Sequence, residues 1–345
     1  MERYKTFAKS ERGADHVRRN VVCQDASGYY EEDTFAIAAV ADGHGSPQYF
    51  RSDRGAGFAV EVALDTIKEF LRQISFEDES KPDELSGRDL FNDGLRDAHF
   101  RQLEMSILAR WHARIAEDFQ QNPIKEEDTK DLKEKYQKRY ENGEYQGAYG
   151  TTLIALAVTE RFWFVLQIGD GLSVTVNADD SVGIPLALDP LCQDNVTTSI
   201  CQDSALKHFH YYFSDAVPVA IYAATDGVED SFDDDEMLFD LYRSITMVFD
   251  KGFESGVKEV ADFLPIITKR GKGDDTSMIG IIDMDKIAET AARFRERLAE
   301  AEAKAKAAEV PEEAEVPEEA EIPEETEVPE EIEDSEEEDD ELTED

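Results

Sequence analysis

Residues 35–45 read FAIAAVADGHG, an apolar run that ends in an acidic residue among glycines. Its first seven residues are apolar without interruption, which is typical of a short buried strand. The strand ends at Asp42, and a carboxylate at the end of a buried strand is costly unless something compensates for its charge. The stretch therefore predicts a buried sheet and a polar site at the edge of that sheet.

The region that follows this strand predicts long helices. Residues 55–74 and 88–119 carry apolar side chains at helical spacing, so each can bury one face. Residues 120–147 are polar and charged, and they either extend a helix or form a mobile loop.

The next region returns to strands. Runs at 151–158, 161–168 and 172–177 are separated by Thr-Glu and Gly-Asp-Gly, which predicts an antiparallel meander, and residues 179–216 look irregular. Antiparallel strands with helices inserted in pairs predict an α+β layered domain, with sheets inside and helices outside. The remaining expected elements are strands at 217–224 and 276–283 and helices at 235–250, 254–269 and 285–308.

The composition is strongly acidic. The 345 residues include 80 Asp or Glu and 36 Lys or Arg, a net charge of −44. This balance argues against binding to nucleic acid, which needs basic surface, and against attraction to an anionic membrane surface. It also favours a monomer, because copies of the chain repel one another.

Residues 309–345 differ from the rest of the chain. They hold 22 of the acidic residues and no Lys or Arg, and they repeat units such as EVPEEA with a proline every six residues. Proline at this period prevents a continuous helix, and the charge prevents a packed core. We expect a folded domain over 1–284, a helical spacer over 285–308 and a disordered acidic tail over 309–345.

The cysteine content indicates a reducing compartment. Cys23, Cys192 and Cys201 are too few and too scattered for a disulfide framework or a zinc site. The N-terminal segment lacks the apolar core of a signal peptide, and no apolar run approaches the roughly 18–20 residues of a membrane helix. The sequence therefore predicts a cytoplasmic protein.

A few acidic residues lie beside glycine at the ends of apolar runs. One such residue alone indicates a turn, but the repeated context indicates a site. Several converging carboxylates repel one another unless a cation neutralises them, and hard divalent cations such as Mg²⁺ or Mn²⁺ prefer oxygen ligands. The residues are Asp25, Asp42, Asp170, Asp226, Asp274 and Asp275.

The order of these motifs resembles the metal-dependent Ser/Thr phosphatases of the protein phosphatase 2C family, over about residues 10–283. It is most similar to the bacterial branch that opens with a histidine followed by Cys-Gln-Asp, which are His16 and Cys23-Gln24-Asp25 here. The resemblance implies a four-layer αββα sandwich of two antiparallel sheets flanked by helices. The other motifs are Ala41-Asp42-Gly43-His44-Gly45, Gly150-Thr151-Thr152, Gly169-Asp170, Thr225-Asp226-Gly227 and Gly273-Asp274-Asp275-Thr276-Ser277.

The resemblance also implies roles for individual residues. Asp42 would bridge two ions, Mn²⁺ or Mg²⁺, one of them bound by the Gly43 carbonyl, and Asp170 would help to hold a third. His44 would act as general acid towards the leaving Ser or Thr oxygen, while a metal-activated bridging water attacks phosphorus. The remaining metal ligands would be Asp25, Asp226 and Asp274.

Two positions depart from the family pattern. The family commonly has a phosphate-binding arginine where this chain has Asn20; the neighbouring Arg18 and Arg19, with His16, can substitute, or they form an ordinary solvated turn. The last motif usually reads Asp-Asn. Here it reads Asp274-Asp275, so that Asp275 can share or replace the role of Asp274.

We therefore expect a protein-serine/threonine phosphatase involved in signalling, with phosphorylated Ser/Thr proteins as substrates. A partner Ser/Thr kinase is expected from the family alone. The alternatives are a pseudophosphatase or an adaptor that uses the same fold for binding, and another metal phosphoesterase. The sequence has no GxxxxGK[ST] loop and no GxGxxG fingerprint that would support a nucleotide enzyme.

Overall fold

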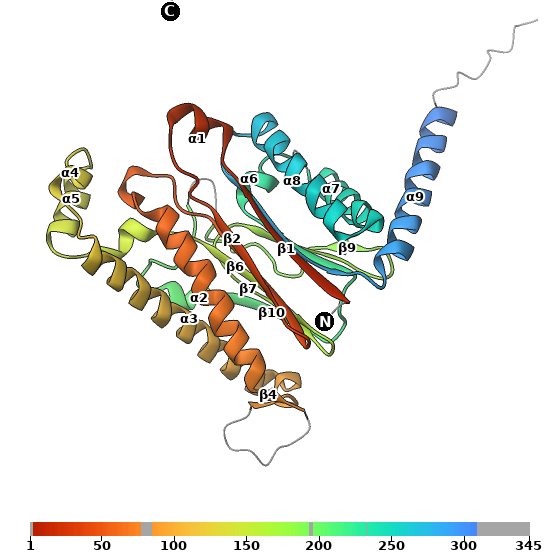
Figure 1. The fold of residues 1–345 in the computed structure, drawn as a ribbon, viewed down its shortest axis with the longest axis horizontal. Coiled ribbons are helices and arrows are strands. Elements are labelled where there is room, and N and C mark those ends of the chain that lie inside the picture. Colours follow the sequence, from red (N-terminus) through yellow and green to blue (C-terminus); the bar gives the residue numbers. More distant parts are fainter. Residues whose placement is uncertain (1–2, 77–84, 193–195, 233, 309–345) are drawn as a thin grey trace, which may run out of the picture. The chain divides into compact units, whose positions relative to one another are not determined.

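The computed structural model describes residues 3–76, 85–192, 196–232 and 234–308 (Figure 1). No helix within these ranges is long and apolar enough to cross a membrane. The chain divides after Glu300 into two units, and the sheets and the site described below lie in the unit Met1–Glu300. The expected tail at 309–345 lies outside the described residues, and the proposed boundaries at 284 and 308 stay predictions.

Two five-stranded sheets, antiparallel throughout, form the centre of this unit. The β1 sheet has the order β1-β12-β11-β8-β9, and the β3 sheet has the order β10-β7-β6-β3-β2. The strands of the β1 sheet are β1 (Tyr4–Glu11), β8 (Leu172–Val176), β9 (Val182–Gly183), β11 (Ala220–Ala224) and β12 (Thr276–Asp283). Those of the β3 sheet are β2 (Ala26–Glu31), β3 (Phe35–Ala41), β6 (Leu153–Thr159), β7 (Trp163–Ile168) and β10 (His210–Ser214).

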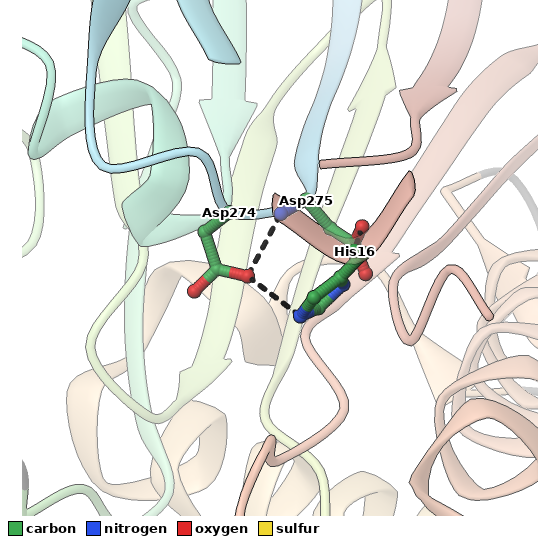
Figure 2. A group of neighbouring side chains, drawn as sticks. All are labelled: His16, Asp274 and Asp275. Carbon is green, nitrogen blue, oxygen red and sulfur yellow. Dashed lines mark hydrogen bonds and ion pairs between the residues drawn. The ribbon is translucent and has the colours of Figure 1, made fainter. Parts of the chain in front are cut away.

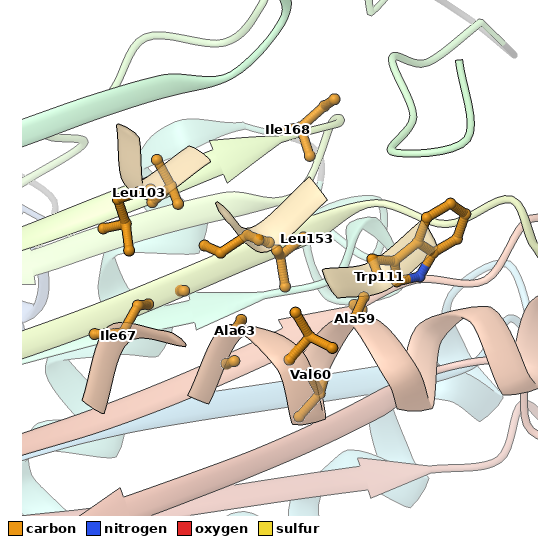
Figure 3. Close-up of a cluster of buried hydrophobic side chains, with 14 of the residues drawn as sticks. Ala59, Val60, Ala63, Ile67, Leu103, Trp111, Leu153 and Ile168 are labelled. Carbon is orange, nitrogen blue, oxygen red and sulfur yellow. The ribbon is translucent and has the colours of Figure 1, made fainter. Parts of the chain in front are cut away.

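Strand β3 contacts both neighbouring layers, because successive side chains of a strand point to opposite faces. Ile37 and Ala39 join a core with helices α2 (Ser52–Gln73) and α3 (Asp93–Gln121). Figure 3 shows this core, with Val60 and Ile67 of α2 facing the sheet. On the other face of β3, Ala36, Ala38 and Val40 pack against β1-sheet residues such as Ile221 and Ile279.

A third core lies between the β1 sheet and helices α7 (Asp235–Val248), α8 (Phe253–Arg270) and α9 (Ile287–Ala308). The first turns of α9 belong to this core, since Ile287 and Phe294 are buried in it. The order helix, sheet, sheet, helix confirms the predicted αββα sandwich. The shorter elements are α1 (Ala14–Arg19), α4 (Glu126–Thr129), α5 (Glu134–Glu141), α6 (Asp226–Glu229), β4 (Ile74–Ser75) and β5 (Leu85–Ser86).

The predicted antiparallel meander is wrong for its third strand. Strands β6 and β7 pair with each other, but β8 pairs with β11 and β9 in the other sheet. The Gly169-Asp170-Gly171 link therefore carries the chain from one sheet to the other instead of making a hairpin. Gly169 has φ 110°, and a Cβ on Gly171 would lie 2.7 Å from the Ala224 carbonyl oxygen, so this crossing favours glycine at both positions.

Candidate active site

The predicted acidic residues come together because their strands end at the same edge of the two sheets. In the β3 sheet, Ala26 pairs with Ala41, which places Asp25 and Asp42 side by side. In the β1 sheet, Ala224 lies between Leu172 and Met278. Asp170, Asp226 and Asp274 therefore lie at this edge too. We call Asp25, Asp42, Asp170, Asp226 and Asp274 the acid edge.

The backbone of Asp42 is fixed by the Thr151-Thr152 pair. The Asp42 carbonyl oxygen accepts hydrogen bonds from Thr152 N at 2.9 Å and from Thr151 Oγ1 at 2.7 Å, and Asp42 N donates to Thr152 Oγ1 at 3.0 Å. A Cβ on Gly43 would lie 2.5 Å from the Gln24 carbonyl oxygen. The glycine thus allows the segment before Asp25 to approach the turn after Asp42.

Asp25 is buried at 9% exposure and is held by Thr225, whose Oγ1 donates to Asp25 Oδ2 at 2.8 Å. Burial raises the pKa of Asp25 to about 8, with further increases from the nearby Asp275 and Asp226. Hydrogen bonds from Ser277 and Thr225 oppose this rise. The charged form of Asp25 is therefore disfavoured unless a cation compensates for it.

The charged forms of Asp42 and Asp226 are disfavoured as well. Burial raises the pKa of Asp42 well above its usual value, and repulsion from Asp25, Asp226 and Asp274 adds to the rise. Burial, with Asp170 as the largest neighbouring charge, raises the pKa of Asp226 to about 6. Burial also raises the pKa of Asp170.

In the part of the chain that the structure describes, no lysine or arginine forms an ion pair with Asp25, Asp42 or Asp226. The donor set consists of carboxylate oxygens, all but those of Asp274 partly or fully buried, and carboxylate oxygens are the ligands that Mg²⁺ and Mn²⁺ prefer. The acid edge therefore fits a site for hard divalent cations.

Asp274 and Asp275 differ sharply although they are neighbours. The Asp274 side chain is 57% exposed and acts on the pKa of Asp42 and Asp226, whereas the Asp275 side chain is 2% exposed. Asp275 accepts hydrogen bonds from the backbone N–H groups of Gly13 and Gln24. This favours Asp274 as the ligand, because the oxygens of Asp275 are already engaged.

The residues predicted to bind the substrate phosphate are less well placed for that role than the acids are for binding a cation. His16 is buried, and its ring faces Asp274 and Asp275 (Figure 2). Arg18 pairs with Asp15 and is 74% exposed, and Arg19 is exposed at the end of α1. Asn20 ends this helix in the left-handed conformation, at φ 56° and ψ 36°, which asparagine tolerates better than arginine does.

His44 lies directly after Gly43 and is held from both sides. Its backbone N–H donates to the Gly150 carbonyl at 3.1 Å, and its carbonyl accepts from Gln24 Nε2 at 3.2 Å. The ring packs edge-on against Tyr49, with 4.7 Å between centroids. Burial lowers the pKa of His44 to about 4, so the imidazole is neutral at pH 7.

Three charged residues beside the acid edge were not predicted from the sequence. Lys272 Nζ lies 2.5 Å from Asp230 Oδ2; this contact, together with Asp226 and Asp274, raises the pKa of Lys272. Burial raises the pKa of Glu229 to about 7. For Lys272, the sequence signal that could have indicated a role was its position between two glycines just before Asp274.

Residues 12–264 match the family model described as Protein phosphatase 2C. Among solved structures, a bacterial serine phosphatase is 14% identical with a TM-score of 0.48, covering 81% of this chain and 97% of that one. The serine/threonine phosphatase Stp1 from Staphylococcus aureus is 14% identical with a TM-score of 0.48, covering 81% and 94%. The catalytic domain of the phosphatase PstP, in complex with 2 manganese ions, is 13% identical with a TM-score of 0.43, covering 81% and 97%. No curated protein matches the sequence.

Proposed function

The chain belongs to the protein phosphatase 2C family, and we propose that it hydrolyses phosphoserine and phosphothreonine in proteins, using divalent cations bound at the acid edge. One observation carries this proposal. Asp25, Asp42 and Asp226 come from three separate strand ends, share one buried edge and have raised pKa values that a cation would reverse.

In this proposal Asp42, together with Asp25, Asp226, Asp274 and the Gly43 carbonyl, would hold two cations. Asp170 would help to hold a third ion. The cations would be Mn²⁺ or Mg²⁺, and when bound they would activate a water for attack and neutralise the charge of the phosphoryl oxygens. The Thr151-Thr152 hydrogen bonds fix the backbone of Asp42, and this restricts where its carboxylate can lie.

His44 is proposed as the general acid for the leaving oxygen. Its low pKa means that at pH 7, in the absence of substrate, the ring is neutral and lacks the second proton that the imidazolium would donate. A phosphate dianion bound beside the ring would raise this pKa, because an opposite charge favours the imidazolium. The proton that His44 donates to the leaving Ser or Thr oxygen would therefore be acquired when substrate binds.

Lys272 is an additional candidate for contact with the substrate phosphate. Arg18, Arg19 and His16 remain the candidates that the family resemblance suggests, but His16 faces two aspartates and Arg18 is paired. Lys272 is 67% exposed on a four-carbon stem and lies near Asp226 and Asp274. It can swing from Asp230 towards a bound phosphate.

The partners and location follow from the same reading. We propose phosphorylated Ser/Thr proteins as substrates and a Ser/Thr kinase as the opposing enzyme, with the chain acting as a monomer in the cytoplasm, away from nucleic acid and membranes. Cys23, Cys192 and Cys201 are all free thiols, which suits a reducing compartment. The net charge of −44 supports the exclusion of nucleic acid.

The experiment compares phosphothreonine, phosphoserine and phosphotyrosine peptides of one sequence, incubated with the purified full chain and Mn²⁺. We expect turnover of the first two peptides and little of the third. A folded protein without turnover of any peptide would favour the pseudophosphatase or adaptor alternative, and a preference for nucleotides or small phosphate esters would favour a different phosphoesterase.

A further inference from the structure

Asp275 is a buried carboxylate beside the acid edge, and the proposed metal site does not use it. It is 3% exposed and immediately precedes strand β12. A buried carboxylate needs hydrogen-bond donors around it, and the donors that Asp275 finds belong to a segment more than 250 positions away in the sequence.

Both oxygens of Asp275 accept hydrogen bonds from backbone N–H groups. Oδ1 lies 2.6 Å from Gly13 N, and Oδ2 lies 2.6 Å from Gln24 N. These two residues flank the loop that contains α1, and Gln24 directly precedes Asp25. One carboxylate thus fixes both ends of the segment that delivers Asp25 to the acid edge.

Other contacts connect the same two segments. Asp15 N donates to the Gly273 carbonyl at 2.9 Å, and Ala14 N donates to Thr268 Oγ1 at 2.9 Å. A Cβ on Gly13 would lie 2.5 Å from the carbonyl oxygen of Gly273. The α1 segment and the loop before β12 therefore touch backbone to backbone.

His16 completes this arrangement (Figure 2). Its Nδ1 lies 2.9 Å from Asp275 Oδ1, and its Nε2 lies 3.6 Å from Asp274 Oδ1. The same Asp274 oxygen accepts a hydrogen bond from Asp275 N at 2.8 Å. The backbone of Asp275 therefore orients the Asp274 carboxylate, and the His16 ring lies beside the same oxygen.

We propose that Asp275 and His16 are positioning residues, which set the separation and orientation of the metal ligands Asp25 and Asp274. A carboxylate suits this task because it accepts from two N–H groups at once, whereas asparagine at the same position has one acceptor oxygen. The inference rests on the proposed function, since it concerns the ligands of that site. Groups that orient metal ligands typically change metal affinity by about 10–100-fold.

The test is Mn²⁺ binding to the full chain, measured by isothermal titration calorimetry without substrate. Asp275→Asn keeps the shape of the side chain and one acceptor oxygen and should weaken Mn²⁺ binding about tenfold. Asp275→Ala removes both acceptor oxygens without adding bulk and should weaken it up to about 100-fold. His16→Asn, whose amide nitrogen replaces Nδ1, should retain more affinity than His16→Leu.

Asp283→Asn is the matched control. Asp283 is a fully buried acid at the other end of β12, where Arg3 Nε and Nη2 donate to its Oδ2 at 3.0 and 2.7 Å. Its substitution should lower the melting temperature but leave the Mn²⁺ affinity unchanged. Melting temperatures of all variants, measured with chelator, separate loss of stability from loss of positioning.

The outcomes are distinguishable. If the wild-type chain binds no Mn²⁺, the proposed function fails, and the positioning role falls with it. If wild type binds but both Asp275 variants bind equally well, or Asp283→Asn weakens binding as much as they do, the inference alone is overturned. Loss of affinity in Asp275→Asn equal to that in Asp274→Asn would instead make Asp275 a ligand.

Discussion

Two groups of partly buried acids in this molecule differ in whether the chain supplies them with a cationic partner. Asp118 on α3 has a 12% exposed side chain and accepts from Arg54 Nη1 at 2.8 and 3.0 Å and from Tyr149 Oη at 2.6 Å. Arg51 lies 3.8 Å away. At the acid edge, Asp42 and Asp226 face other carboxylates instead of arginines, and their pKa values are raised.

The difference shows which acids the fold leaves for a ligand. Asp180 and Asp283 follow the Asp118 pattern, since both are buried and paired with cationic side chains. A buried acid that is paired with a cationic side chain has its charge compensated within the chain, and removal of either partner is strongly destabilising. A buried acid without a cationic partner is disfavoured in its charged form, and a bound cation would stabilise that form.

The largest expected effect is that of Asp226→Asn. Loss of a proposed ligand to the metal site should reduce kcat/KM for a phosphothreonine peptide by about 10³-fold or more, equivalent to about 4 kcal/mol of transition-state stabilisation. The same substitution removes repulsion, so the melting temperature with chelator should rise. A fall in this melting temperature would show that Asp226, like Asp118, has a stabilising partner within the chain. Steady-state kinetics and thermal melts measure the two effects.

Asp118→Asn should do the reverse. It leaves Arg54 and Arg51 without their partner, so the free energy of unfolding should fall by about 2 kcal/mol, between the values for exposed and for buried ion pairs. The Mn²⁺ affinity and kcat/KM should stay close to wild type. Chemical denaturation measures the free energy of unfolding. A large loss of activity in a folded variant would show that Asp118 serves the active site as well as the fold.

The pH dependence of the metal-free protein provides a third test. The pKa of Asp25 is about 8 when folded, against 3.8 for a free side chain, so its stabilising contribution is complete below about pH 4 and is lost as the pH rises towards 8. His44 affects stability in the opposite direction. Its lowered pKa makes the free energy of unfolding rise with pH, but only between its folded pKa of about 4 and its ordinary value of 6.5. The range from pH 6.5 to 8.5 therefore isolates the acids.

Over this range Asp25 alone should lower the free energy of unfolding by about 2 kcal/mol with chelator, which corresponds to about 5 °C in melting temperature. Saturating Mn²⁺ should remove most of the fall. Asp25→Asn should flatten the dependence, whereas Glu104, whose pKa burial raises to about 7 elsewhere in the molecule, should contribute equally in all samples. A flat profile for metal-free wild type would contradict the raised pKa of Asp25.

Lys272→Ala should have a smaller effect on catalysis. Loss of one exposed cation near the phosphate should raise KM for the phosphopeptide about threefold, equivalent to about 0.6 kcal/mol, with kcat nearly unchanged. Lys258→Ala on α8 is the control, because Lys258 pairs with Asp262 away from the acid edge. Equal KM values for wild type and Lys272→Ala would return the phosphate-binding role to Arg18 and Arg19.

The smallest expected effect is that of deleting residues 309–345. This segment contains 22 of the 80 acidic residues, and none of the predicted metal ligands lies in it. Kinetics of the truncated chain on the phosphothreonine peptide should match those of the full chain at 0.15 M salt, where charges beyond about 8 Å are screened. A loss of activity would support the adaptor alternative.

Local sequence signals predicted most of the framework. The apolar runs of β3, β6, β11 and β12 and the periodicity of α2 gave these elements correctly, because each is buried on a full face. Strand β1 was missed because its sequence, YKTFAKSE, is half polar and becomes a strand through pairing with β12. The crossing at Gly169 was misread, since a hairpin turn and a crossing between sheets use the same residues.

The acid edge was predicted through position after apolar strands, and the structure brings those residues together. The difference in burial between Asp274 and Asp275 could not be predicted, because the sequence around them does not show that Asp275 is covered by Gly13 and Gln24. Lys272 was missed for the same reason, since its proximity to Asp226 depends on how two loops pack.

The central claim is that the acid edge holds divalent cations that hydrolysis requires. The most direct test is turnover of a phosphothreonine peptide by the wild-type chain after treatment with chelator, followed by stepwise addition of Mn²⁺ or Mg²⁺, with Asp42→Asn in parallel. We expect no turnover with chelator, recovery on addition of metal, and no recovery in Asp42→Asn. Turnover that persists with chelator, or that Asp42→Asn recovers fully, would contradict it.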